Sequence, residues 1–132
     1  MNNGDCAAFV LVVDDDTDLR ETLAEVLVDN AYQVVSAANG QEALDILHST
    51  ATRPCIILLD LMMPIMDGKT FRAALMKESR LSDIPVVVLS AHANMSEVLA
   101  DVDVHAKLQK PVPIGPLLAL VDRHCKDTAA VR

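Results

Sequence analysis

Aromatic side chains are scarce in this 132-residue chain: they make up 2% of it, and tryptophan is absent. Because hydrophobic residues still account for 52%, the core must be built from aliphatic side chains. Basic residues are also few, with 11 lysines and arginines against 19 acidic residues and a formal net charge of -8. That charge repels phosphate backbones, and no basic stretch offsets it, so we expect no direct nucleic-acid partner.

Long apolar runs and paired cysteines are missing as well. No apolar run approaches the length that spans a membrane, and residues 1–5 lack the basic and apolar regions of a signal peptide. We therefore expect a cytoplasmic protein without a membrane partner. Cys6, Cys55 and Cys125 are odd in number and widely spaced. This pattern favours buried or idle thiols over disulfides or a zinc site.

Short aliphatic runs alternate five times with segments of helical periodicity. Runs this short and this apolar are typical of buried strands in a parallel sheet. The expected strands are Phe9–Val13, Tyr32–Ala37, Cys55–Asp60, Ile84–Ser90 and Val104–Gln109. The expected helices follow Asp16 or Thr17 as N-cap, Asn39-Gly40 and Gly68, with a short one near Met95–Ala100 and a last one through Ile114–Val121.

The burial of each strand indicates its place in the sheet. The first, third and fourth strands are apolar almost throughout, as strands covered on both faces should be. The second includes Gln33 and Ser36, and the fifth alternates apolar with polar residues, so these two form the edges. With right-handed crossovers the prediction is an α/β protein with a flavodoxin-like (βα)5 doubly wound fold, whose five-stranded parallel sheet has the order 2-1-3-4-5. We expect one domain over residues 9–125, with tails at 1–8 and 126–132.

Acidic residues stand at the ends of two central strands. Asp14 and Asp15 follow the first strand, and Asp60 ends the third. These ends meet at the switch point of the sheet, where open α/β folds bind ligands. Like charges packed together raise one another's pKa, so the cluster needs a cation at neutral pH. A few carboxylates completed by waters and a carbonyl suit Mg²⁺.

Two further strand ends supply a hydroxyl and a positive charge. Ser90 closes the fourth strand, and Lys110 follows the fifth. Carboxylates, a metal, a hydroxyl and an ammonium group together describe a site that accepts a phosphoryl group, because that chemistry depends on positioning and neutralising the equatorial oxygens. Alone, Ser90 would be read as a loop hydroxyl and Lys110 as a surface lysine; their convergence with three carboxylates favours the site.

Four short motifs stand in order at the ends of the first, third, fourth and fifth strands. They are Val12-Val13-Asp14-Asp15, Leu59-Asp60-Leu61-Met62-Met63-Pro64 with Met66-Asp67-Gly68, Val88-Leu89-Ser90-Ala91, and Lys110-Pro111. In this order they resemble the CheY-like receiver domain of two-component response regulators. The resemblance covers roughly Phe9 to Cys125.

The resemblance implies how the acidic residues work. Asp60 would be phosphorylated by a histidine kinase or a histidine phosphotransfer protein. Asp15 would bind Mg²⁺ directly and Asp14 directly or through water, with Asp60 and the Met62 main-chain carbonyl as further ligands.

The same resemblance assigns the groups that hold the phosphoryl oxygens. Ser90, the backbone amide of Ala91 and Lys110 would each contact the phosphoryl group. The Lys110–Pro111 peptide bond would be cis, which an X-Pro bond allows at low cost.

A receiver of this kind is a signalling module and not an enzyme, apart from its own phosphorylation and dephosphorylation. The family implies that a downstream protein or a second copy binds the face formed by the fourth helix, fifth strand and fifth helix. Lys107 stands where the family usually has Tyr or Phe. The usual aromatic switch cannot operate in its ordinary form, and Lys107 should stay at the surface because burying an unpaired ammonium is costly.

Two other functions stay open at this point. The segment Asp14–Thr17 after an aliphatic strand resembles the Asp-x-Asp nucleophile motif of haloacid dehalogenase-type phosphohydrolases, although the chain is short for that family. The second alternative is a degenerate receiver that acts only as a binding module, which the missing aromatic residue makes conceivable.

Overall fold

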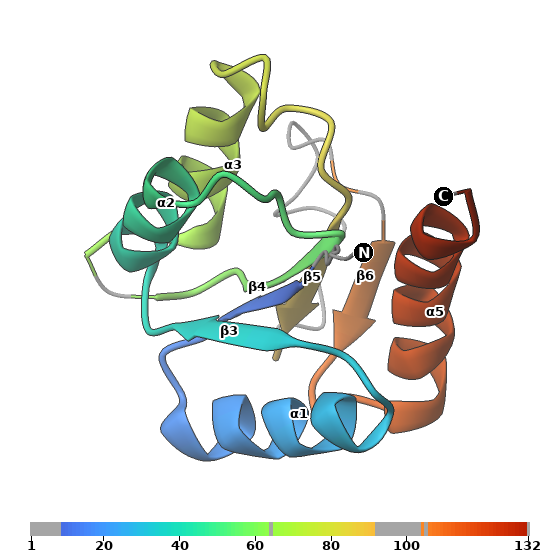
Figure 1. The fold of residues 1–132 in the computed structure, drawn as a ribbon. Coiled ribbons are helices and arrows are strands. Elements are labelled where there is room, and N and C mark those ends of the chain that lie inside the picture. The colour runs from blue at the N-terminus through green and yellow to red at the C-terminus, as the bar shows by residue number, and fades with distance from the viewer. Residues whose placement is uncertain (1–8, 64, 92–103, 105, 132) are drawn as a thin grey trace.

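The structure, a computed structural model, is a five-stranded parallel sheet with helices on both faces (Figure 1). It describes residues 9–63, 65–91, 104 and 106–131. For residues 126–131 it describes the backbone but not the side chains. The strands are β2 (Val10–Val13), β3 (Val34–Ala37), β4 (Ile56–Asp60), β5 (Val86–Ser90) and β6 (Ala106–Gln109). Their spatial order is β3-β2-β4-β5-β6, which confirms the predicted order 2-1-3-4-5.

Of the helices in the described part of the chain, two cover each face of the sheet. The helices are α1 (Thr17–Asp29), α2 (Gly40–Ser49), α3 (Gly68–Met76) and α5 (Ile114–Val131). In Figure 1, α2 and α3 lie on one side of the strands and α1 and α5 on the other. The buried side chains form two matching clusters, one that includes Phe71 and Leu75 of α3 and one that includes Leu117 and Val121 of α5.

The alternation of side chains along β2 explains why a short aliphatic run suits this position. Leu11 and Val13 belong to the cluster under α2 and α3, whereas Val10 and Val12 belong to the cluster under α1 and α5. Successive residues of a strand point to opposite faces, so a strand covered on both sides must be apolar at every position. All four residues of β2 are buried.

Side-chain caps fix where three of the helices begin. Asp16 accepts a hydrogen bond from the Leu19 amide, so it is the N-cap of α1 and Thr17 is the first helical residue. Asn39 caps α2 and Asp67 caps α3 in the same way. Each cap satisfies an amide that has no partner inside its helix.

Several strands are shorter than the sequence predicted. β3 begins at Val34 rather than at Tyr32, because the Tyr32 hydroxyl donates to Asp122 of α5 and the ring packs among the residues under α1 and α5. β5 begins at Val86, directly after Pro85, which has no amide to donate to a ladder. β6 begins at Ala106. The short helix expected near Met95–Ala100 lies outside the described residues.

The expectation that the cysteines are separate thiols was wrong for two of them. Cys55 and Cys125 form a disulfide, with an S–S distance of 2.00 Å and a Cα–Cα distance of 5.2 Å. They are 70 residues apart in the sequence. The fold brings them together because α5 packs along the sheet beside the start of β4, which spacing along the chain does not reveal.

No helix in the described part of the chain is both long and apolar enough to cross a membrane.

Candidate functional site

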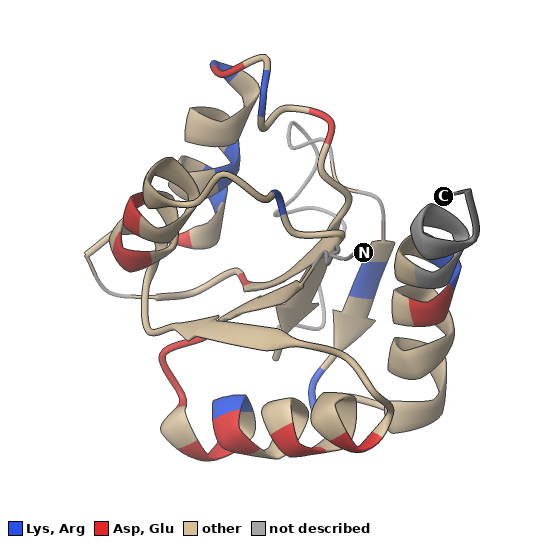
Figure 2. Ribbon diagram, viewed as in Figure 1, with Lys and Arg blue, Asp and Glu red and all other residues tan. Residues whose placement is uncertain are grey.

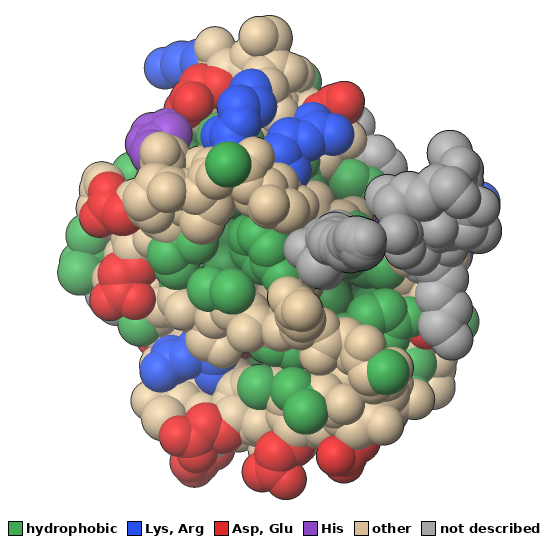
Figure 3. All heavy atoms as spheres, viewed as in Figure 1, with side chains coloured by type: hydrophobic (Ala, Val, Ile, Leu, Met, Phe, Trp, Pro, Cys, Tyr) green, Lys and Arg blue, Asp and Glu red, His purple; other side chains and the backbone are tan. Residues whose placement is uncertain are grey.

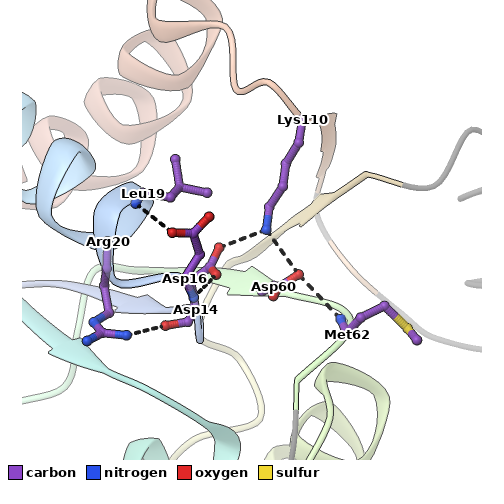
Figure 4. A network of polar contacts seen from close by, with 7 residues as sticks. All are labelled: Asp14, Asp16, Leu19, Arg20, Asp60, Met62 and Lys110. Carbon is purple, nitrogen blue, oxygen red and sulfur yellow. Dashed lines mark hydrogen bonds and ion pairs between the residues drawn. The ribbon is translucent and has the colours of Figure 1, made fainter.

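The predicted site residues meet at the carboxyl edge of the sheet. Asp14 follows β2, Asp60 is the last residue of β4, Ser90 is the last of β5 and Lys110 follows β6. Parallel strands end at the same edge, so these side chains come from four neighbouring strands. Figure 4 shows Asp14, Asp60 and Lys110 pointing toward one another. Asp14, Asp60 and Ser90 are buried, with at most 4% of their surface exposed.

Three carboxylates converge at this edge. Asp14, Asp15 and Asp60 each offer an oxygen within 4.8 Å of the others. Asp14 and Asp60 are buried, whereas Asp15 is exposed and faces solvent at the mouth of the cluster. Three carboxylate oxygens are hard donors that can hold a small divalent cation, with water in its remaining coordination positions. The donor set therefore fits a metal of the magnesium type.

Lys110 is the positive charge of the site. Its Nζ atom lies 3.0 Å from Asp14 Oδ2 and 3.4 Å from Asp60 Oδ1. Burial alone would lower the pKa of Lys110, but the bond to Asp14 and the charges of Asp14 and Asp60 outweigh it, so the pKa of Lys110 is raised and the ammonium stays charged. The Lys110 amide donates to the Ser90 carbonyl at 2.7 Å, and the Lys110–Pro111 peptide bond is cis, as the family resemblance implies.

Asp60 is the carboxylate whose ionisation the site alters most. Burial is the largest cause and the charge of Asp14 is the second; together they raise the pKa of Asp60 to about 7. The Lys110 charge and the hydrogen bond from the Met62 amide act in the opposite direction but do not cancel the rise. A cation bound beside such a carboxyl group lowers its pKa and so favours its ionised form.

The backbone that carries Asp14 is held by a residue that the sequence analysis did not identify. Arg20 Nη1 donates to the Asp14 carbonyl oxygen at 2.7 Å, and Asp14 Oδ1 accepts from the Asp16 amide at 2.8 Å (Figure 4). Arg20 is the only basic residue of α1, one turn past its start. In the sequence, Arg20 could have been noticed as the one basic residue of an otherwise acidic helix.

The charge pattern makes Arg20 conspicuous. Figure 2 shows a single basic residue on α1 among acidic ones, and acidic side chains project from the outer side of this helix in Figure 3. The acidic residues of α1 are Asp18, Glu21, Glu25 and Asp29. Acidic residues thus line α1, while Lys110 and Arg20 supply the positive charge that contacts Asp14.

Gly68 holds the end of β4 in place through a close backbone approach. Its amide donates to the Leu61 carbonyl at 2.9 Å. A Cβ atom at this position would lie 2.7 Å from the Asp60 carbonyl oxygen and 2.9 Å from the Leu61 Cα. Only a residue without a side chain fits there, so the start of α3 packs directly on the residue that carries the central carboxylate.

The remaining predicted residues lie around the rim. The Met62 amide donates to Asp60 Oδ1 at 3.3 Å, while 57% of the Met62 surface is exposed. Ala91 is exposed just past β5. Lys107 is exposed on β6, where it is paired in register with Val88 of β5. The surface position of Lys107 agrees with the prediction.

Comparisons with known proteins agree with this geometry. A family model described as the response regulator receiver domain matches residues 10–122. The chain is 42% identical over 112 residues to response regulator MprA from Mycolicibacterium vanbaalenii and from Mycobacterium avium. These matches cover 83% of this chain and 47% of each relative, so the chain spans about half the length of the curated relatives it matches.

Solved structures with the same fold include a receiver domain of a histidine kinase and a chemotaxis protein. The signal receiver domain of a signal transduction histidine kinase from Syntrophus aciditrophicus superposes with a TM-score of 0.82 at 29% identity, covering 92% of both chains. Chemotaxis protein CheY4 of Vibrio cholerae superposes with a TM-score of 0.79 at 29% identity, covering 90% of this chain and 99% of that one.

Proposed function

Because this chain belongs to the receiver-domain family of two-component response regulators, we propose that Asp60 is its phosphoacceptor. One observation carries the proposal: Asp60 is the carboxylate at the end of a central strand that lies within reach of both an acidic pair and the Lys110 ammonium. A partner that carries a phosphohistidine, either a histidine kinase or a histidine phosphotransfer protein, would be the donor.

The transfer is a substitution at phosphorus. A carboxylate oxygen of Asp60 forms a bond to the phosphorus atom, the phosphorus–nitrogen bond of the phosphohistidine breaks, and the electron pair stays on the imidazole of the donor. Lys110, already 3.4 Å from Asp60 Oδ1, would pair with a phosphoryl oxygen, and the Ser90 hydroxyl and Ala91 amide would contact the others. Positioning and charge neutralisation are the contributions of these residues.

Mg²⁺ is the cofactor that the three carboxylates would hold. When bound, it screens the repulsion between the incoming phosphoryl group and the carboxylates. Asp15, Asp14 and Asp60 would be its side-chain ligands, with the Met62 carbonyl as a main-chain ligand. The raised pKa of Asp60 supports this assignment, because Lys110 alone does not offset the burial of the acidic pair, so a further cation would favour the ionised form that the nucleophile requires.

The wider role of the protein follows from the family. The receiver unit would comprise residues 9–125, with tails at 1–8 and 126–132, and act in the cytoplasm as a signalling module rather than as an enzyme on other substrates. Phosphorylation would change its affinity for a downstream protein or a second copy at the surface that includes β6 and α5. Because Lys107 replaces the usual aromatic residue, this change would run mainly through Ser90 and the segment that follows it.

Neither alternative function gains support of its own. The family match is to receiver domains, and a haloacid dehalogenase-type role for Asp14 would leave the convergence of Asp60 and Lys110 without a purpose. A receiver that only binds partners would have no need of a buried carboxylate pair facing a lysine.

The proposal is tested by labelling with a small phosphodonor. Wild-type protein, Asp60→Asn and the control Asp45→Asn, an exposed residue of α2, are treated with acetyl phosphate and Mg²⁺ and then reduced with borohydride, which converts an acyl phosphate to an alcohol. Label mapped to Asp60 in wild type and Asp45→Asn, and none in Asp60→Asn, is expected. Label on Asp14, or full labelling of Asp60→Asn, would overturn the assignment.

A further inference from the structure

Cys55 and Cys125 connect the strand that carries Asp60 with the last helix, α5. Cys55 directly precedes β4, the strand that ends in Asp60, and Cys125 lies on α5. Both are buried, with 9% and 7% of their surface exposed, in the cluster under α1 and α5. The disulfide therefore ties α5 to the amino end of a strand whose carboxyl end carries the proposed phosphoacceptor.

The surroundings of Cys55 suit the thiol as well as the disulfide. Cys55 Sγ lies 3.5 Å from the carbonyl oxygen of Phe9, a distance at which a thiol can donate a weak hydrogen bond and a disulfide sulfur cannot. The neighbouring side chains are apolar, and a reduced cysteine packs well among them. Neither redox form leaves an unsatisfied polar group at Cys55, so the site accommodates both.

The compartment decides how such a pair behaves. Disulfides are rare in the cytosol, where thiol reductants act on them, and those that occur there in mesophiles are usually transient and redox-sensing. A receiver that acts in the cytoplasm thus has no reason to keep a permanent disulfide. We propose that Cys55 and Cys125 form a reversible redox site, which a dithiol reductant opens and whose state sets how firmly α5 is held to the sheet.

The exchange is balanced without any group from the phosphorylation site. A thiolate of the dithiol reductant attacks one protein sulfur, the Cys55–Cys125 bond breaks, and a mixed disulfide forms. The second thiol of the reductant then attacks its own mixed-disulfide sulfur and releases the protein thiol. Two electrons and two protons pass to the protein, which ends with two thiols, while the reductant ends as a disulfide.

The structural consequence is confined to α5. The buried residues of this helix recur at one spacing, Leu117, Val121 and Cys125, and Cys125 is the last buried side chain that the structure describes there. The backbone of the helix continues to Val131. Opening the disulfide removes the covalent restraint at the end of this row, so the final turns of α5 should open more often. Asp60 is five residues from Cys55 along β4, roughly 16 Å away, so its surroundings should not change.

The first test counts thiols in the intact wild-type protein. Protein purified without reductant is denatured and alkylated, and peptides are mapped before and after reduction. We expect a cross-linked peptide containing Cys55 and Cys125, with only Cys6 alkylated. Three alkylated cysteines after exposure to a mild oxidant such as oxidised glutathione would overturn the proposal.

The second test asks whether the bond opens in the folded state and frees α5. Amide hydrogen exchange is followed in oxidised wild-type protein and in protein treated with a dithiol such as dithiothreitol under native conditions. Reduction should lower protection in the final turns of α5 by about tenfold or more and leave β2 and β4 unchanged. A disulfide that reacts only after denaturant is added would instead be a permanent structural link, and the redox site would be refuted.

Cysteine variants test whether the change in α5 hydrogen exchange depends on Cys55 and Cys125. In Cys55→Ser and Cys125→Ser, α5 exchange should no longer respond to reductant, whereas the control Cys6→Ser should respond like wild type. If a serine variant fails to fold, the wild-type titration with reductant still decides. The proposal depends on the cytoplasmic location but not on phosphorylation of Asp60, and none of these measurements uses a phosphodonor, so either proposal can fail alone.

Discussion

The surroundings of Asp60 disfavour the ionised carboxylate that the proposed phosphoryl transfer requires. The side chain is 4% exposed and shares its surroundings with the buried Asp14, and burial with this neighbour raises its pKa to about 7. In the proposed transfer, the carboxylate must be ionised to attack phosphorus. Lys110 offsets part of the repulsion, and a bound divalent cation would offset the rest. Burial and the neighbouring Asp14 therefore make the ionised form of Asp60 costly, and a bound cation would reduce that cost.

This cost predicts a dependence of stability on pH in the metal-free protein. Asp60 has a higher pKa in the folded chain than in the unfolded chain, where an aspartate titrates near 3.9. Between about pH 4 and 7 the folded state binds the extra proton, so the contribution of Asp60 to stability is greatest below that window and is lost as the pH rises through it. In EDTA, Asp60→Asn should raise the melting temperature by a few degrees at pH 8 and much less at pH 5.

Calorimetry at the two pH values, with Asp45→Asn as a control for removing a charge, measures the difference. Adding Mg²⁺ at pH 8 should stabilise wild-type protein more than Asp60→Asn. An equal effect of Asp60→Asn at both pH values would contradict the raised pKa.

The two acids before α1 should differ in their contribution to metal binding. Asp14 already lies 3.0 Å from the Lys110 ammonium, whereas Asp15 is exposed at the mouth of the cluster, and the family places this second acid in direct coordination. We expect Asp15→Ala to weaken Mg²⁺ binding by about tenfold or more and Asp14→Ala to weaken it less. Lys110→Ala should still bind Mg²⁺, because it removes a competing cation, but should respond poorly to phosphorylation.

Titration calorimetry with Mg²⁺ measures all three variants. Glu25→Ala, on the outer side of α1, controls for the general loss of negative charge. Equal affinities in wild type, Asp14→Ala and Asp15→Ala would refute this ranking of the ligands.

At the scale of elements, the contact between the start of α3 and the end of β4 positions Asp60, the proposed phosphoacceptor. A methyl group at Gly68 would meet the backbone of Asp60 and Leu61 rather than a flexible side chain, so neither partner can yield without moving the strand end. Gly68→Ala should cost about 1–3 kcal/mol of unfolding free energy and also slow phosphorylation of Asp60 by acetyl phosphate.

Gly115 provides the matched control for this substitution. It lies in the first turn of α5, and a Cβ atom there would meet nothing within 4 Å. Gly115→Ala should leave phosphorylation unchanged and raise stability by up to about 1 kcal/mol, because alanine has the higher helix propensity. Urea denaturation and labelling rates separate the two effects. A neutral Gly68→Ala would show that the strand end is more pliable than its packing indicates.

At the scale of the whole molecule, the candidate site and the proposed partner surface are linked by the pairing of β5 with β6. Ser90 ends β5 at the carboxyl edge, while Lys107 lies exposed on the neighbouring β6 in register with Val88. A charged side chain loses much solvation on burial, so Lys107 should remain at the surface when Asp60 is phosphorylated. With beryllofluoride and Mg²⁺, the amide resonances of Ser90 and Ala91 should shift strongly and that of Lys107 less.

Two variants complete this prediction. Lys107→Tyr should change partner binding, because it introduces a ring that can turn inward, and Ser90→Ala should reduce the response to beryllofluoride. A larger shift at Lys107 than at Ser90, or an unaltered response in Ser90→Ala, would show that activation follows another route.

The sequence by itself determined the strand order and the edge of the sheet at which the site lies, because both follow from the pattern of apolar and polar residues along each strand. A strand covered on both faces must be apolar at every position, as Val10–Val13 is, and residues at the ends of parallel strands must share one edge. Asp14, Asp60, Ser90 and Lys110 could therefore be grouped before any coordinates. The bounds of the edge strands could not, since Tyr32 leaves the ladder to bond Asp122 on a helix 90 residues away.

Only the tertiary structure decided which residues distant in the sequence touch. The Cys55–Cys125 pair depends on α5 packing beside the start of β4, and nothing in a separation of 70 residues indicates that contact. The bond from Arg20 to the Asp14 carbonyl and the close approach of Gly68 to Asp60 join residues that are near in the sequence, but they too depend on how the start of each helix packs on the strand before it. Periodicity records which face a residue presents, whereas the neighbour it meets there is set by the packing of the whole chain.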